Sequence, residues 1–165
     1  MVKKILVNLA VFEVGWLVCV MGGDFFAVAF TLFALILHGY LVLGSQSEWK
    51  FIVCVVAVGC LWDVAMAKIG VINYTEVTPL GIPLWLICLW VLFATTFMHG
   101  LRWLNERYLL AGLLAAVLGP ATYWAGGNLN DAHLGEPITA SFVIMAAGWA
   151  LLFPCGMYCA GKMSS

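Results

Sequence analysis

The chain has 165 residues, of which 65% are hydrophobic and only 9% are charged. Because an ordinary soluble domain carries about 25% charged residues, this composition excludes a soluble fold. The net charge of -1 provides no basic surface for a phosphate backbone, which excludes nucleic acid as a partner.

The charged residues occur in clusters, and the apolar stretches between them have the length of membrane-spanning helices. A helix needs about 20 apolar residues to cross a hydrocarbon core of roughly 30 Å. The pattern therefore predicts an all-α polytopic membrane protein with a single transmembrane domain over residues 1–165. Six helices are expected, at residues 5–21, 25–43, 51–69, 83–101, 108–125 and 138–160.

Turn signals place the boundaries of these helices. Gly22-Gly23-Asp24 predicts a turn after the first helix, and the polar stretch 44–48 is expected to link the second helix to the third. Pro83 falls where the first turn of the fourth helix would begin. The fifth helix has a face of small residues, which allows another backbone to approach closely: Ala111, Gly112, Ala115, Ala116 and Gly119.

The distribution of basic residues predicts the orientation in the membrane. With the N-terminus inside, six Lys and Arg residues are cytoplasmic (Lys3, Lys4, Lys50, Arg102, Arg107 and Lys162), and Lys68 lies outside. Positive residues favour the cytoplasmic side, so both termini are expected in the cytoplasm.

Two carboxylates are expected within the membrane. Glu13 lies near the centre of the first helix, and Asp63 in the outer half of the third. Each adds about 3 kcal/mol to insertion, whereas ten large apolar residues return about 4 kcal/mol, so both helices can still insert. Such groups indicate a functional site unless they only bind helices together as hydrogen-bonded carboxyl groups.

Four further residues complete a candidate intramembrane polar site with the two carboxylates. His38 and His99 are expected in the inner halves of their helices, near Arg102, where imidazole could carry protons, ligate a metal or simply pack at the interface. Tyr123 is expected near the outer interface, where tyrosine commonly anchors a helix. Because the two histidines lie on different helices without clustered partners, we expect no metal and no cofactor.

The motifs of common soluble enzymes are absent from the sequence. It has no G-x-S-x-G, H-E-x-x-H, Walker or G-x-G-x-x-G pattern, so the residues leave open whether the protein is an enzyme. Its six cysteines form no C-x-x-C pair and are expected to pack as small apolar residues.

Residues 83–104, PLWLICLWVLFATTFMHGLRWL, resemble the signature of an uncharacterised bacterial inner-membrane family, domain of unknown function 2878. The resemblance extends to FEVGW at 12–16, to Asp63 and Gly70 around the third helix, and to GPATYWAG at 119–126, and so covers nearly the whole chain. The chain differs at Gly100, where the family commonly has serine, and at Glu13, where glutamine is frequent. The resemblance implies a multi-pass protein of the bacterial inner membrane, but no reaction.

Three functions remain open at this point. The first is binding or transport of a small apolar or lipid-like molecule in a cavity lined by Glu13, Asp63 and His99. The second is a membrane-embedded enzyme that modifies a lipid, with His99, Arg102 and Asp63 as its polar groups. The third is an accessory or assembly protein, whose polar residues hold helices or a partner together. Membrane lipids are expected as partners, and a homo- or hetero-oligomer is left open.

Overall fold

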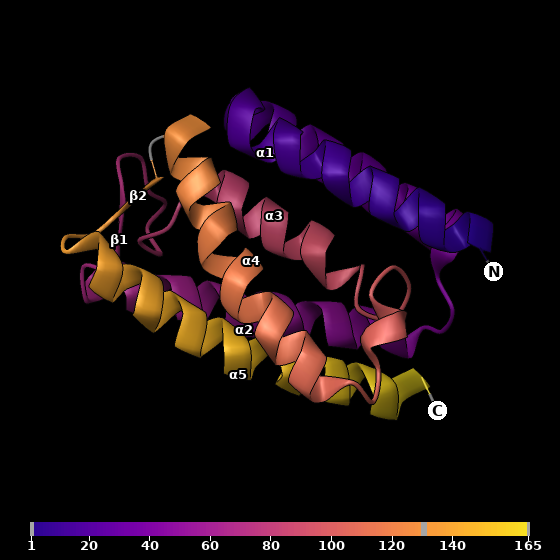
Figure 1. Ribbon diagram of the computed structural model, residues 1–165. Helices are drawn as coiled ribbons and strands as arrows, with labels where there is room; N and C mark the ends of the chain where they lie inside the picture. Colours follow the sequence, from indigo (N-terminus) through magenta and orange to yellow (C-terminus); the bar gives the residue numbers. More distant parts are fainter. Residues whose placement is uncertain (1, 130–131, 165) are drawn as a thin grey trace.

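The computed structural model describes residues 2–129 and 132–164 as a helical bundle (Figure 1). The all-α class is confirmed. Its helices are α1 (Val2–Leu37), the π-helix η1 (His38–Val42), α2 (Ser47–Lys68), α3 (Leu84–Ala94), the 3-10 helix η2 (Arg102–Leu104), α4 (Tyr108–Leu129) and α5 (Ile138–Ser164). Two short antiparallel strands, β1 (Ile72–Tyr74) and β2 (Ala132–Leu134), pair the two loops at one end of the bundle.

Four helical segments within the described residues are long and apolar enough to cross a membrane. They are Val2–Val42, Ser47–Lys68, Tyr108–Leu129 and Ile138–Met163. Three of them correspond to predicted helices, and each of their ends lies within four residues of the predicted one. The first spans both of the first two predicted helices and ends at Val42, one residue before the predicted end of the second.

Helix α1 is a hairpin rather than one straight helix. Gly23 has φ 74° and ψ 176°, which interrupts the helical backbone at the predicted turn. A straight helix would separate Lys4 from Val42 by about 57 Å, yet the Lys4 ammonium donates to the Val42 carbonyl at 3.4 Å. The chain therefore has two antiparallel arms, residues 2–22 and 24–42, close to the predicted helices 5–21 and 25–43.

The prediction of a helix over residues 83–101 is wrong for residues 95–101. Helix α3 ends at Ala94, and residues 95–101 continue in turns. Eleven residues give a helix of about 17 Å, which is too short to cross the hydrocarbon core alone. The turns carry the chain onward, since the Trp85 amide contacts Asp24 near one end of the bundle and His99 contacts Glu48 near the other.

The two ends of the bundle carry different groups. The first residues of α1 and the last residues of α5 lie at one end, and β1 and β2 lie at the other (Figure 1). The α1 turn is at the same end as the strands, because the Asp24 carboxylate accepts a hydrogen bond from the Trp85 amide at 3.1 Å. We call these the terminal end and the strand end.

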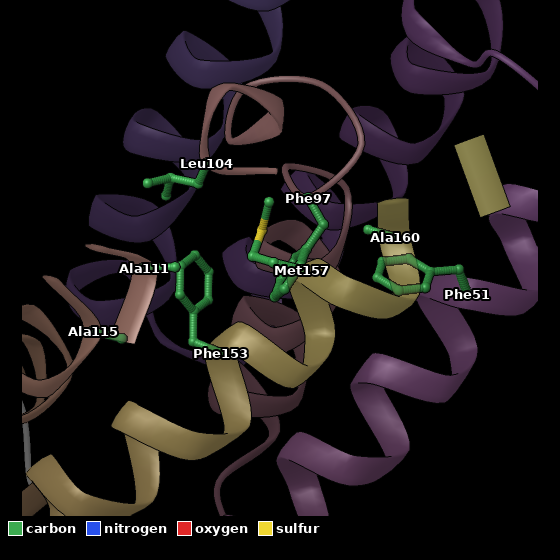
Figure 2. Packing of buried hydrophobic residues seen from close by; sticks show 8 residues of the cluster. All are labelled: Phe51, Phe97, Leu104, Ala111, Ala115, Phe153, Met157 and Ala160. Carbon is green, nitrogen blue, oxygen red and sulfur yellow. The ribbon is translucent and has the colours of Figure 1, made fainter. Parts of the chain in front are cut away.

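The turns after α3 are covered by protein near the terminal end. Phe97 is 3% exposed, and its ring lies 5.6 Å from that of Phe51 on α2 and 5.3 Å from that of Phe153 on α5. Figure 2 shows this core, to which Leu104, Ala111, Ala115, Met157 and Ala160 also belong. Irregular backbone at membrane depth is tolerated where it is buried in protein in this way.

Tryptophans packed on glycines bring the helices close together. A Cβ atom on Gly59 would lie 2.2 Å from the Trp90 ring, and one on Gly119 would lie 2.4 Å from the Trp149 ring. The two indoles stack at 5.5 Å with their planes 4° apart, joining α3 to α5. The predicted small-residue face of α4 is confirmed, because a Cβ atom on Gly112 would lie 3.0 Å from the Ala150 carbonyl oxygen of α5.

Replacing Gly119 with alanine is expected to destabilise the bundle. The added methyl group must displace the Trp149 ring, and overpacking of this kind costs about 1–3 kcal/mol. We expect the thermal unfolding midpoint of the purified protein in detergent micelles to fall. Gly126→Ala on the same helix is the matched control, because a Cβ atom there meets no atom within 4 Å. Equal unfolding midpoints for both variants would contradict this account of α4–α5 packing.

Candidate functional site

Where α3 ends at Ala94, side chains form hydrogen bonds to backbone groups that have lost their helical partners. The hydroxyl groups of Thr95 and Thr96 donate to the carbonyls of Leu92 and Phe93, at 2.7 and 2.6 Å. Such bonds between threonine and the preceding turn compete with the regular helix. They fix the first residues after Ala94, where the chain leaves the helix.

Asn8 on the first arm of α1 satisfies the freed backbone on both sides of the break. Its amide nitrogen donates to the Thr95 carbonyl at 3.1 Å, and its amide oxygen accepts from the Gly100 N–H at 3.1 Å. A Cβ atom on Gly100 would lie 2.9 Å from that oxygen. The absence of a side chain at Gly100 therefore lets Asn8 approach closely.

The turns after α3 bring His99 to a buried cluster near the terminal end, which we call the inner cluster: His38, Glu48 and His99. The Nε2 atoms of His38 and His99 lie 2.9 and 2.7 Å from the same Glu48 oxygen, Oε1. His38 and Glu48 are 4% and 3% exposed, whereas the His99 side chain is 14% exposed. The two predicted histidines thus come together, and a carboxylate joins them.

Each residue of the inner cluster comes from a different element. His38 begins the π-helix η1, in which the Leu43 N–H donates to the His38 carbonyl at 2.8 Å. Glu48 lies in the first turn of α2, and its second carboxylate oxygen accepts from the Gly44 N–H at 3.2 Å. Short π-helical turns are frequent at functional sites.

The donor set of the inner cluster is suited to cations. Among the residues that the structure describes, one Glu48 oxygen and the two imidazole nitrogens form a group that could hold a metal ion. These atoms lie within 4.8 Å of one another. The Nδ1 atom of His38 is buried without a hydrogen-bond partner among the described residues. A cavity of about 10 Å³ adjoins His38, Asn8 and Thr95, which is about the space of one water.

A second buried carboxylate lies further along α2, and we call its surroundings the Asp63 cluster: Asp63, Trp90 and Tyr123. One Asp63 oxygen accepts from the Trp90 indole at 2.5 Å, and the other accepts from the Tyr123 hydroxyl at 2.6 Å. Asp63 is 0% exposed. Since its partners lie on α3 and α4, this carboxylate joins three helices.

Tyr74 on β1 lies close enough to Asp63 for that carboxyl group to affect the pKa of the tyrosine hydroxyl. Burial raises the pKa of the Tyr74 hydroxyl, and the Asp63 carboxyl raises it further. The hydroxyl therefore keeps its proton and remains a donor. Within the described residues this hydroxyl is buried and has no hydrogen-bond partner. The same is true of the indole nitrogens of Trp62 and Trp149.

The predicted site residues do not form one cavity. Glu48 and Asp63 are fifteen residues apart on the same helix, or about 22 Å. Glu13 is exposed on the first arm of α1, and Arg102 is exposed in η2. The structure therefore joins His38 with His99, and Asp63 with Tyr123, and it leaves Glu13 and Arg102 outside both clusters. The groups of the lipid-enzyme hypothesis, His99, Arg102 and Asp63, do not converge.

A larger cleft opens at the strand end, and we call it the outer cleft. Its volume is about 590 Å³, and it is lined by Gly23, Asp24, Thr75, Glu76, Val77, Thr78, Pro83, Leu84 and Trp85. It lies between the α1 turn, the loop after β1 and the start of α3. Its walls combine two carboxylates with an aromatic and several aliphatic side chains.

Sequence reasoning missed Glu48, Asn8 and Trp90. Glu48 was expected in a polar linker, but Ser45-Gln46-Ser47-Glu48 before an apolar run has the S-x-x-E spacing that often begins a helix. In the structure the Ser45 hydroxyl accepts from the Ser47 N–H at 3.3 Å without capping α2, and the Glu48 N–H donates to the Ser45 backbone carbonyl at 3.1 Å. For Asn8, its place within an apolar run was the available signal. For Trp90 the sequence contained none, because indoles are common in such helices.

A family model described as a protein of unknown function (DUF2878) matches residues 5–155 of the chain. The match includes every residue of both clusters and of the outer cleft. No curated protein and no solved structure matches the chain.

Replacing Asn8 with alanine is expected to destabilise the protein, because it leaves the Thr95 carbonyl and the Gly100 N–H without partners. Each unsatisfied buried group costs about 1–3 kcal/mol. Unfolding of the purified protein in micelles, followed by circular dichroism, should show a clear loss of stability. Asn128→Ala is the matched control, since Asn128 is exposed and bonds the Trp124 carbonyl of its own helix. Equal stability of the two variants would show that Asn8 does not support the break.

Proposed function

This chain belongs to the DUF2878 family of proteins of unknown function, and we propose that it is a six-span protein of the bacterial inner membrane that binds a small lipid-like molecule. Both termini lie in the cytoplasm in this proposal. One observation carries the binding function, namely the outer cleft. Its volume of about 590 Å³ falls within the roughly 300–1,000 Å³ of small-molecule sites.

The six spans are supported by the path of the chain. The α1 hairpin supplies two passes, because Lys4 and Val42 meet at its open end. Helix α3 with the turns that follow it supplies a fourth pass between the contacts of Trp85 and His99 at opposite ends. Together with α2, α4 and α5, this gives six.

The orientation is supported by the charges at the two ends. Lys4 lies beside Val42, and Lys50 follows Glu48 of the inner cluster by two residues. Arg102 follows His99 of the same cluster by three. Lys68, by contrast, is at the end of α2 that leads into β1. Basic residues therefore gather at the terminal end, which the positive-inside rule assigns to the cytoplasm.

The class of ligand follows from the walls of the outer cleft. Leu84, Val77 and Trp85 offer an apolar surface, and the Asp24 and Glu76 carboxylates offer negative charge beside it. One Asp24 oxygen accepts from the Trp85 amide, which orients this carboxylate at the cleft. An amphiphile with an apolar part and a positively charged amine matches both features, and an amine over Trp85 would add a cation–π attraction.

We expect reporter fusions to give alternating sides along the chain. Green fluorescent protein fused after Ser45 or Glu106 should fluoresce, because those positions are cytoplasmic, and alkaline phosphatase fused after Asp24 or Val77 should be active. The full chain with a C-terminal fluorescent protein is the reference. Phosphatase activity after Ser45, or fluorescence after Asp24, would contradict the six-span orientation.

We expect the purified protein to retain an amphiphilic amine that mass spectrometry of an organic extract can identify. Glu76→Gln should reduce the retained amount at least several-fold, because the variant removes a carboxylate of the cleft while keeping its size. Glu106→Gln is the matched control, since Glu106 is exposed near the terminal end, outside the cleft. An extract without any such molecule, or equal retention by both variants, would contradict the binding function.

A further inference from the structure

We propose that the inner cluster is a binding site for a divalent transition metal, with His38, Glu48 and His99 as its ligands. This inference concerns the other end of the bundle from the outer cleft and does not depend on the lipid-like ligand. It also goes against the expectation from sequence, in which the two histidines had no clustered partner. The structure supplies that partner in Glu48.

The positions of the ligand atoms are close to those around a metal. Two ligand atoms bound at about 2.0–2.2 Å to a tetrahedral ion lie roughly 3.3–3.6 Å apart. Both Nε2 atoms lie within 2.9 Å of Glu48 Oε1, and all three ligand atoms lie within 4.8 Å of one another. Shifts of about half an ångström to one ångström in side chains would therefore place an ion between them.

The ligand types restrict the choice of metal. Imidazole nitrogen favours Zn²⁺, Fe²⁺, Co²⁺ and similar ions over Mg²⁺ and Ca²⁺, which prefer oxygen. Two histidines and one glutamate are three protein ligands, and sites of this kind keep a further position open for water or a substrate. Because the His99 side chain is 14% exposed, this fourth position can be reached from the terminal end.

The surroundings of the cluster hold its ligands in place. The His38 ring packs edge-on against Trp49 at 5.7 Å, and the Glu48 carboxylate is held by the Gly44 N–H. His99 is set by the turns that Asn8 stabilises. The cavity beside His38 could hold one water, and metal-ligating histidines commonly give their second nitrogen such a partner.

Cobalt titration of the whole chain tests the site. The protein in detergent micelles is treated with a chelator, freed of it, and titrated with Co²⁺ alone while visible absorption is recorded. We expect one Co²⁺ per chain, with the strong visible bands of a four-coordinate nitrogen and oxygen site, and displacement by Zn²⁺. Loss of even an outer partner weakens metal binding about 10–100-fold. Glu48→Gln and His99→Gln should therefore each weaken Co²⁺ binding at least about tenfold.

Two matched controls separate the site from general effects of substitution. His133→Gln changes an exposed histidine on β2, and Asp63→Asn changes the other buried carboxylate of α2. Both should keep the wild-type affinity and spectrum. If Glu48→Gln fails to fold, wild-type protein must still show the bands and a higher unfolding midpoint with Co²⁺. Absence of stoichiometric binding by wild type, or unchanged binding after loss of Glu48 or His99, would overturn the proposal whether or not the outer cleft binds its ligand.

Discussion

Inside an apolar bundle, every backbone N–H and C=O group needs a hydrogen-bond partner. This requirement has its largest effect on the structure at the end of α3. At Ala94 the chain leaves the helix within a long apolar run, and several amides and carbonyls lose their helical partners. Asn8 meets this requirement from another helix, with its amide on the Thr95 carbonyl and the Gly100 N–H. The position of α1 beside α3 is thereby tied to the break itself.

The inner cluster depends on that break. In a continuous helix, residues 95–101 would follow the axis of α3, but the turns instead direct His99 to Glu48 at 2.7 Å. The second arm of α1 changes to π-helix at the same level and contributes His38. Two departures from regular helix therefore meet at one carboxylate. Because departures of this kind carry a cost in stability, their meeting at a set of ionisable groups favours a functional role over simple packing.

Local signals in the sequence predicted the helices well, and distant contacts explain where the prediction failed. The α1 turn follows from Gly22 and Gly23, whose effect is confined to neighbouring residues. The end of α3 was missed, since residues 83–99 contain no glycine or proline after Pro83 and the decisive partner, Asn8, lies 87 residues from Thr95. The inner cluster was half predicted, because the histidines stood out as ionisable groups in apolar runs, whereas their meeting required the break.

The two buried carboxylates of α2 differ in what their partners can do. Asp63 accepts from an indole and a phenol, which donate one proton each and do not ligate metals at their ordinary protonation. Each of its oxygens accepts a hydrogen bond, and these bonds join three helices, which suits a fixed structural contact. Glu48 contacts two imidazole nitrogens, a type of group that can ligate a metal. The two acids of α2, about 22 Å apart, therefore have partners of different chemistry: those of Asp63 fix three helices to one another, whereas those of Glu48 are potential metal ligands.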